Sequence, residues 1–458
     1  MSNKILSNLN CLHVPFFKFF SLLLLLMLAS PFVLAQTGVG IKTDLAVYPE
    51  GNAPALSSAG TKTTDPVFGT QVLRVTDETN GSDSGTAYSY WSTFNKDSTQ
   101  ILIYGSNPAI QGFDPVSFNL VGPKRAFPSP PGGGFTTSED AIWSGLDPNK
   151  LLVHRGLTIW ALNTSTMTYT QVGDVTSSLP AGSYFWQMSV SRDDNVFAFS
   201  FRNPDSSFGG YVVWQRSTNR VVYSVNTSDL DEVQIDKTGR YLVVKTGLQG
   251  RGIIEVKTVD LQTQVVSDLT DDGPDYAPGH SDNGRGTVIG MDNWDNSLTF
   301  RNLANPHVFT RALYWGSNWA NGGGHVSFLG DDENWALVSS YNATRSSGTF
   351  NNEIYLVATD GSQRVRRFVH HYSYYVANYN NMPRANISRD GKFVAFTSTW
   401  GNTNRRDLFI AKVPNTAVTP PWSSVPIGIT TKSVQKPTLT PTIMVTRSSN
   451  GKSTLTNH

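Results

Sequence analysis

Two histidines have side chains and surroundings suited to chemistry. His280 and His325 each follow a glycine, in Gly279-His280 and Gly324-His325. Neutral imidazoles bind divalent transition metals such as Mn²⁺, and they also act as general bases. In the structural alternative, both rings form hydrogen bonds with loop backbone. The residue types leave both the chemical and the structural interpretation open. A divalent metal is expected only under the chemical interpretation.

Aromatic side chains gather in the segments that precede short apolar runs. Their ring faces suit the CH-rich face of a pyranose, and neighbouring Asn, Asp and Arg suit its hydroxyls. We expect ligand contacts from Tyr90, Tyr184, Trp319, Tyr372, Tyr374, Tyr375 and Tyr379. Trp91, Trp143 and Trp186 occupy one repeated position, so we expect them to pack between structural units.

Several classes of function are disfavoured by composition and motifs. The 36 Lys and Arg residues nearly balance the 35 Asp and Glu residues, and no basic block occurs, so we expect no nucleic-acid partner. No Gly-x-Ser-x-Gly motif occurs, which disfavours a serine hydrolase. Asp331-Asp332-Glu333 and Asp271-Asp272 fall at expected turns, where Asp accepts backbone hydrogen bonds.

Seven related segments place these residues on one architecture. Each is a polar turn followed by a short apolar run, as in Asp390-Gly391 before Lys392-Phe-Val-Ala-Phe396. The anchors are Asp97, Asp147, Asp193, Asp236, Asn283, Asp331 and Asp390, with steps of 50, 46, 43, 47, 48 and 59 residues. A second strand–turn–strand half follows in most units. This pattern predicts an all-β, seven-bladed β-propeller with four-stranded blades.

The last unit lacks one strand, because the pattern stops after Asp407–Val413. A matching strand occurs early, in Val72-Leu-Arg-Val-Thr76. We therefore predict that residues 71–77 complete the final blade and close the ring, which removes exposed strand edges. Residues before the first strand of each unit then gather at one mouth of the central channel.

The chain divides into four predicted parts. Residues 1–35 have the features of a signal peptide, with an apolar run from Phe19 to Leu28 and a Val33-Leu34-Ala35 end. This predicts a secreted or periplasmic protein with no membrane span after removal of the leader, which also holds the sole cysteine, Cys11. Residues 36–65 form an irregular segment and residues 66–414 the propeller. Residues 415–458, rich in Ser, Thr and Pro, are expected to be disordered.

The Ser388-Arg-Asp-Gly391 repeat with its following strand resembles the TolB-like and WD40-like propellers. The glycine–histidine segments, together with Thr397-Ser-Thr-Trp-Gly401, resemble more faintly the oligogalacturonate lyases. That resemblance implies a histidine-rich metal site and cleavage of uronate oligosaccharides by β-elimination. It assigns possible ligand roles to His280 and His325. Further family histidines have no counterpart here, since the corresponding stretch contains Asn380 to Asn386.

Two functions of different classes follow from these observations. The first is a non-catalytic binding or scaffold propeller that recognises a glycan or an extracellular protein through its aromatic loops. The second is a polysaccharide-lyase-like enzyme, in which His280, His325 and Arg384 act at the substrate carboxylate and a tyrosine or histidine is the base. Residue types alone favour binding, because a fold does not imply a function.

Overall fold

The structure is a computed structural model. It describes residues 40–128, 131, 141–246, 255–269, 279–292, 296–315, 323–342, 348–374, 378–401 and 403–414. The predicted leader, residues 1–35, and the predicted tail, residues 415–458, lie outside these ranges, as do Trp319 and Tyr375. In the described ranges, none of the helices has the length and apolar character needed to cross a membrane.

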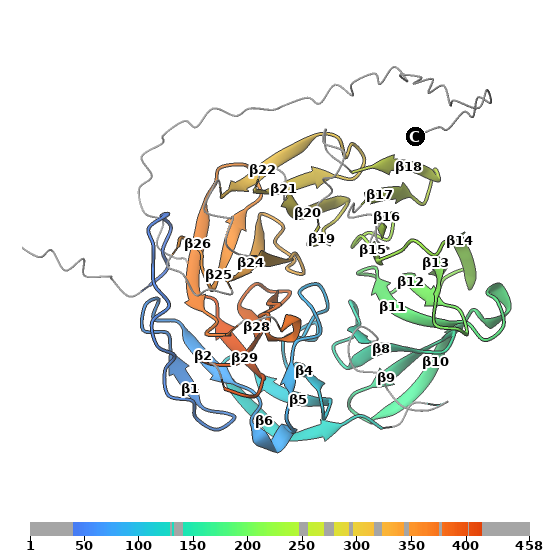
Figure 1. Cartoon of the computed structure of the whole chain (residues 1–458). Helices are drawn as coiled ribbons and strands as arrows, with labels where there is room; N and C mark the ends of the chain where they lie inside the picture. The colour runs from blue at the N-terminus through green and yellow to red at the C-terminus, as the bar shows by residue number, and fades with distance from the viewer. Residues whose placement is uncertain are drawn as a thin grey trace, which may run out of the picture. The chain divides into compact units, whose positions relative to one another are not determined.

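Seven antiparallel sheets form the propeller ring, seen along its axis in Figure 1. Blade 1 contains β3 (Ser84–Gly85), β4 (Gln100–Gly105), β5 (Ala109–Asp114) and β6 (Asn119–Ala126). Blade 2 contains β7 (Ala141–Trp143), β8 (Lys150–Arg155), β9 (Thr158–Asn163) and β10 (Thr168–Asp174). Blade 3 contains β11 (Tyr184–Val190), β12 (Val196–Arg202), β13 (Phe208–Gln215) and β14 (Arg220–Asn226).

Blades 4 to 6 repeat this order. Blade 4 contains β15 (Glu232–Ile235), β16 (Tyr241–Thr246), β17 (Glu255–Asp260) and β18 (Val265–Asp268). Blade 5 contains β19 (Ser281–Asn283), β20 (Thr287–Asp292), β21 (Ser297–Asn302) and β22 (Phe309–Tyr314). Blade 6 contains β23 (Gly323–Ser327), β24 (Trp335–Tyr341), β25 (Glu353–Ala358) and β26 (Val365–His370). Short 3₁₀ turns occur at η1 (Glu78–Asn80), η2 (Thr176–Ser178) and η4 (Tyr379–Asn381).

The seventh blade closes the ring, and the predicted pairing is confirmed. It contains β27 (Asn386–Ile387), β28 (Phe393–Ser398) and β29 (Asp407–Lys412) from the end of the propeller. β2 (Gln71–Arg74) then pairs with β29, with Leu73 opposite Ile410. One strand was not predicted: β1 (Lys62–Thr64) pairs with β2 as a fifth strand of this sheet.

Burial follows the position of a strand within its blade. The second strand of blade 3, β12, is buried along almost its whole length, whereas the outermost strand, β14, alternates exposed and half-buried residues. A strand covered on both faces carries a continuous apolar run, and a strand covered on one face shows a period of two. The repeats are therefore recognisable mainly from their second strands.

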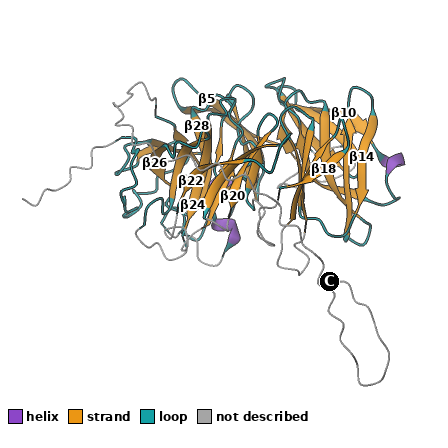
Figure 2. Cartoon of the chain, turned by 90° about the horizontal axis from the view of Figure 1, so that it is seen from above, coloured by secondary structure: helices purple, strands orange, loops and turns teal. Residues whose placement is uncertain are grey.

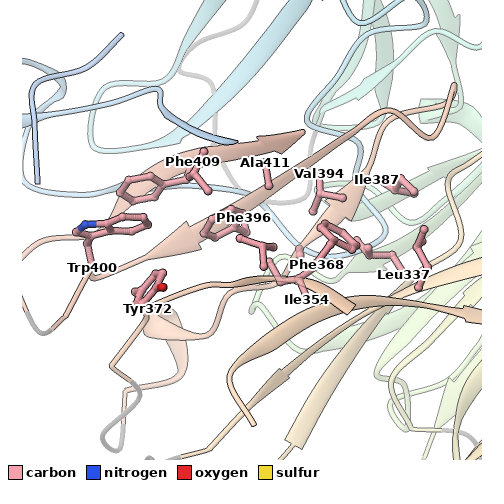
Figure 3. Close-up of a cluster of buried hydrophobic side chains, with 14 residues drawn as sticks. Leu337, Ile354, Phe368, Tyr372, Ile387, Val394, Phe396, Trp400, Phe409 and Ala411 are labelled. Carbon is pink, nitrogen blue, oxygen red and sulfur yellow. The ribbon is translucent and has the colours of Figure 1, made fainter. Parts of the chain in front are cut away.

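Figure 2 shows the strands of the ring after a turn of 90° from Figure 1. The core lies between blades, as the close-up in Figure 3 illustrates. Figure 3 shows Leu337, Ile354 and Phe368 of blade 6 against Val394, Phe396 and Phe409 of blade 7, and all six are buried. Trp91 and Trp143 are also buried, as expected for inter-blade packing. The expectation for Trp186 was wrong: its side chain is 43 % exposed, because β11 has a register shift between Phe185 and Gln187.

The repeated acidic anchors act in turns. Asp236 accepts hydrogen bonds from the backbone N–H groups of Arg240 and Tyr241, both at 2.8 Å. In the last blade, the Ser388 hydroxyl donates to Asp390 and accepts from the Phe393 N–H. These contacts set the turn between the first and second strands, so the repeat in the sequence reflects turn geometry.

Candidate functional site at the first channel mouth

His280 and His325 meet at the mouth of the central channel where the first, innermost strand of each blade (its inner strand) begins. His280 directly precedes β19 and is only partly buried, whereas His325 lies within β23 and is fully buried. Their ring centroids are 4.4 Å apart, and the ring planes are inclined by 18°. The fold thus brings the two predicted histidines together from neighbouring blades.

The hydrogen bonds of the two rings differ. His280 Nδ1 lies 2.6 Å from the Gly324 carbonyl oxygen. Because a carbonyl oxygen only accepts, Nδ1 carries the proton and Nε2 keeps its lone pair. Both ring nitrogens of His325 are buried without a hydrogen-bond partner among the described residues. The sequence left open whether the two histidines serve chemistry or form hydrogen bonds with backbone. The second alternative fits His280 and does not fit His325.

Both imidazoles are held neutral. Burial lowers the pKa of His280, and the Lys245 ammonium acts in the same direction, against the hydrogen bond to Gly324. Burial also holds the pKa of His325 well below its usual range, and the neighbouring His280 and Arg384 reinforce the effect. A neutral imidazole offers a lone pair, so this pair can accept a proton or a hydrogen bond near pH 7.

Arg384 supplies a cation beside the histidines. It precedes β27, and its guanidinium carbon lies 5.5 Å from the ring centroid of Tyr379. It donates long hydrogen bonds of 3.3 Å to the backbone carbonyls of Ala87 and Asn380, and its Nε is buried without a partner. No carboxylate among the described residues forms an ion pair with it, so its charge is free to meet a ligand anion.

The predicted tyrosines separate into different places. Tyr90 packs on Tyr88 at 4.8 Å and donates a hydrogen bond to Glu232, across the channel in blade 4. Tyr379 is 50 % exposed beside Arg384, and Tyr374 is half-buried nearby in the sequence. Tyr184 donates to Ser206 within blade 3. Tyr372 lies in the inter-blade core of Figure 3, 5.0 Å from Trp400, with its hydroxyl bonded to Asp65.

Tyr88, Glu232 and Lys245 belong to this mouth, although the sequence did not single them out as site residues. The Tyr88 ring contacts His325 edge-on at 5.0 Å. Glu232 and Lys245 form a buried ion pair beside the Tyr90 ring. Glu232 is the first residue of the inner strand of blade 4, and His280 immediately precedes the inner strand of blade 5. An alignment of the blade sequences would therefore have indicated Glu232 as a residue of this mouth.

A complete metal site is not formed by the described residues. They contain no group of three or more His, Cys, Asp or Glu side chains arranged to hold an ion. Asp282, a candidate third ligand, accepts from the backbone N–H groups of Phe328 and Asn283 instead. Asn378 caps η4 through a hydrogen bond from the Asn380 N–H. Two nitrogens are fewer than the ligands of a tetrahedral or octahedral site, so the described residues do not fit a resident metal.

Comparisons with known proteins bear on the fold. No protein-family model and no curated protein matches the sequence. Two solved structures are similar at 12 % identity and a TM-score of 0.58. One is an oligogalacturonate lyase from Vibrio parahaemolyticus, matched over 80 % of this chain and 100 % of that chain. The other is an oligogalacturonate lyase in complex with manganese, matched over 82 % and 98 %.

A WD40-repeat propeller is also similar, with a TM-score of 0.45, 11 % identity, and coverage of 81 % of this chain and 99 % of that chain. At such low identity, the likeness to the two lyases concerns the fold alone. This chain is a seven-bladed β-propeller that shares its fold with oligogalacturonate lyases.

Proposed function

We propose that this protein binds an acidic glycan, one that carries uronate carboxylates, at the first channel mouth. The observation that carries the proposal is Arg384, a half-buried guanidinium whose Nε is buried without a hydrogen-bond partner and which has no carboxylate partner among the described residues. A guanidinium pairs with a carboxylate through two parallel hydrogen bonds. Burial of this cation is costly unless an anion joins it, so a ligand carboxylate would supply the missing partner.

The groups around Arg384 suit the rest of a sugar ring. The half-exposed face of Tyr379 offers a stacking surface, and the unprotonated Nε2 of His280 accepts a hydrogen bond from a hydroxyl. Tyr90 and the Glu232–Lys245 pair add further polar groups at this mouth. An extracellular protein ligand is the competing partner, and it would use the same exposed tyrosines.

Calorimetric titration tests the proposal with uronate oligosaccharides and with neutral galacto-oligosaccharides. We expect binding of the acidic series, and Arg384→Gln should weaken it about tenfold or more, the effect of losing a charge-assisted hydrogen bond. Arg364→Gln is the matched control, because that arginine pairs with Asp360 in an outer turn of blade 6. Equal binding of the neutral series, or unchanged affinity in Arg384→Gln, would contradict the proposal.

The paired neutral histidines favour a second candidate, a lyase activity. In β-elimination the substrate carboxylate is neutralised, a base removes the proton on the adjacent carbon, and the glycosidic oxygen leaves as a double bond forms. Arg384 would neutralise the carboxylate, and His280 Nε2 would take the proton. His325 stacks on His280, with ring centroids 4.4 Å apart, and would fix the orientation of that imidazole.

Ultraviolet absorbance of the unsaturated product tests this second candidate, with and without added Mn²⁺, on a panel of uronate polysaccharides. Activity that disappears in both His280→Ala and His325→Ala would support catalysis. His307→Ala serves as the control, since His307 is exposed after β21. If absorbance rises on no substrate while uronate oligosaccharides bind tightly, the lyase candidate is rejected and only the binding function is supported.

A secreted or periplasmic location is part of the proposal. It is supported by the apolar run and small-residue end within residues 1–35. N-terminal sequencing of exported material should give a start near Gln36. An exported chain that retains Met1 would contradict the cleavage.

A further inference from the structure

The second mouth of the channel carries a ring of cations at equivalent positions of the blades. Inner strands begin at the first mouth, and each residue advances the chain by about 3.3 Å, so residues after these strands lie at the other end. Lysine or arginine follows the inner strand in blades 3, 4, 5 and 7, and Lys96 precedes β4 in blade 1. The set is Lys96, Arg192, Lys237, Arg285 and Arg389.

These cations reach across the channel toward other blades. Arg192 of blade 3 donates to the Leu329 carbonyl of blade 6 at 2.6 Å. Arg389 of blade 7 donates to the Gly145 carbonyl of blade 2, also at 2.6 Å. Lys237 donates to the Gly330 carbonyl at 2.7 Å, and Lys96 to the Leu146 carbonyl at 2.8 Å. Four of the five cations, all except Lys96, also share Asp331 or Glu333, so these four converge on one small region.

Among the described residues, two carboxylates form ion pairs with these cations. Asp331 lies 3.3 to 3.6 Å from Arg389, Arg192 and Arg285, and so is shared among three guanidinium groups. Glu333 pairs with Lys237 at 2.9 Å and with Arg285 at 3.2 Å. Asp282 also acts on Arg192 and Lys237 through its charge. It is buried and tied to backbone N–H groups, and burial raises its pKa to about 6.

Two further features mark this cluster of cations. Burial lowers the pKa of Lys237 to about 8, and the nearby Arg192 contributes to the shift. Burial likewise lowers the pKa of Arg192 to about 10, with Arg389 and Arg285 acting in the same direction. In addition, the Nε atoms of Arg192 and Arg389 are buried without a hydrogen-bond partner among the described residues. The cluster thus holds crowded cations and unused donors together.

We propose that this second mouth binds a tetrahedral oxyanion, a phosphate or sulfate group, through Arg192, Lys237, Arg285 and Arg389. Guanidinium groups present several donors in a fixed plane, and this geometry matches phosphate and sulfate oxygens. An anion at this position reduces the repulsion among the four cations and shares their charge with Asp331. Arg285 and Asp331 are exposed, so the anion reaches the cluster from solvent. The site is distinct from the proposed glycan site.

Thermal unfolding with increasing inorganic phosphate tests the site, with sodium chloride at matched ionic strength as the reference. A saturable rise in melting temperature is expected, because a ligand that binds the folded state stabilises it by mass action. Arg285→Gln and Arg389→Gln should each weaken the phosphate affinity obtained from this rise about tenfold or more. A monosaccharide phosphate ester, tested in parallel, distinguishes a free ion from an esterified group by which one binds more tightly.

Arg364→Gln is again the matched control, since Arg364 and Arg285 are similarly exposed, at 41 % and 46 %, and both are ion-paired. General salt effects on surface hydration raise stability equally in all variants. An identical phosphate response in Arg285→Gln, Arg389→Gln and the control would therefore overturn the proposal, as would the absence of a saturable response in the wild type. Uronate binding at the first mouth should stay unchanged in Arg285→Gln.

Discussion

At the scale of single residues, the fold tolerates a buried polar group whose hydrogen bonds are not made. His325 is fully enclosed by Tyr88, Tyr341 and His280, and neither ring nitrogen has a partner among the described residues. His371, directly after β26, is equally buried, but both of its ring nitrogens are hydrogen-bonded. Nε2 bonds to the Ser340 carbonyl at 2.8 Å, and Nδ1 accepts from the Ser373 N–H at 2.9 Å. Unmade hydrogen bonds at a candidate site indicate a functional constraint on the residue.

These two histidines give a matched prediction. His325→Phe should raise the free energy of unfolding by about 1 kcal/mol, because it removes buried donors and acceptors that have no partner. His371→Phe should lower it by about 2 kcal/mol, because it leaves the Ser373 N–H and the Ser340 carbonyl unpaired. Chemical denaturation measures both. Equal destabilisation by the two substitutions would show that His325 has partners in solution.

At the scale of elements, the segment before the propeller is a strap on blade 6. Lys42 forms a β-bridge with Arg367, whose guanidinium donates to the carbonyls of Asp44 and Ala46. His370 Nε2 contacts the Tyr48 carbonyl at 2.9 Å, and its Nδ1 lies 3.5 Å from Asp65. Residues 36–65 were expected to form an irregular segment, and a buried polar network fixes its described part, residues 40–65, to the sheet.

The Asp65–His370 pair should make stability depend on pH. Burial opposes both shifts, but hydrogen bonding and charge between the partners prevail, so the pKa of His370 is raised and that of Asp65 is lowered. The His370 contribution is complete below its ordinary pKa of 6.5 and is lost as pH rises through the raised value. The Asp65 contribution is present above 3.8 and is lost as pH falls through the lowered value.

Asp65→Asn should therefore cost about 3 kcal/mol near pH 6, since it leaves a buried partner unpaired. The loss of stability between neutral and alkaline pH should also flatten in this variant. Denaturation midpoints across the pH range measure both effects. Asp360→Asn is the control, because its ion pair with Arg364 is exposed. If stability fell with the same slope against pH in the wild type and in Asp65→Asn, the Asp65–His370 pair would not be the origin of that pH dependence.

At the scale of the whole molecule, the ring is closed by strands from the two ends of the propeller. Leu73 of β2 is fully buried against blade 7 and the first blade, in a cluster with Phe113, Phe393 and Ile410. A propeller closed in this way has no open edge between its first and last blades. Early and late parts of the chain therefore stabilise each other.

Leu73→Ala should lower the free energy of unfolding by about 3 kcal/mol, through lost burial and the cavity left behind. Leu146→Ala, at a side chain 57 % exposed, makes the same chemical change and should stay within about 0.5 kcal/mol of the wild type. Removal of residues 71–77 should abolish the single cooperative melting transition. A truncated protein that melts as the wild type does would refute closure by β2.

The sequence by itself determined the number of blades, the turns between their first two strands and the pairing of β2 with β29. These features depend on local signals: turn residues at a fixed period, apolar runs of strand length, and one missing strand with one spare. It also predicted that the segments before the first strands, which carry His280 and His325, gather at one mouth, since equivalent positions of a propeller face the same way, but it left open whether the two rings meet.

Tertiary structure alone decided which side chains face a ligand. A register shift in β11 turns Trp186 outward, and contacts with Asp65 and Trp400 draw Tyr372 into the core. The strap on blade 6 and the contacts that bring the second-mouth cations together also appear only in the folded chain. Their partners are separated by up to hundreds of residues, and the direction of a side chain depends on bulges, twist and packing that no local pattern records.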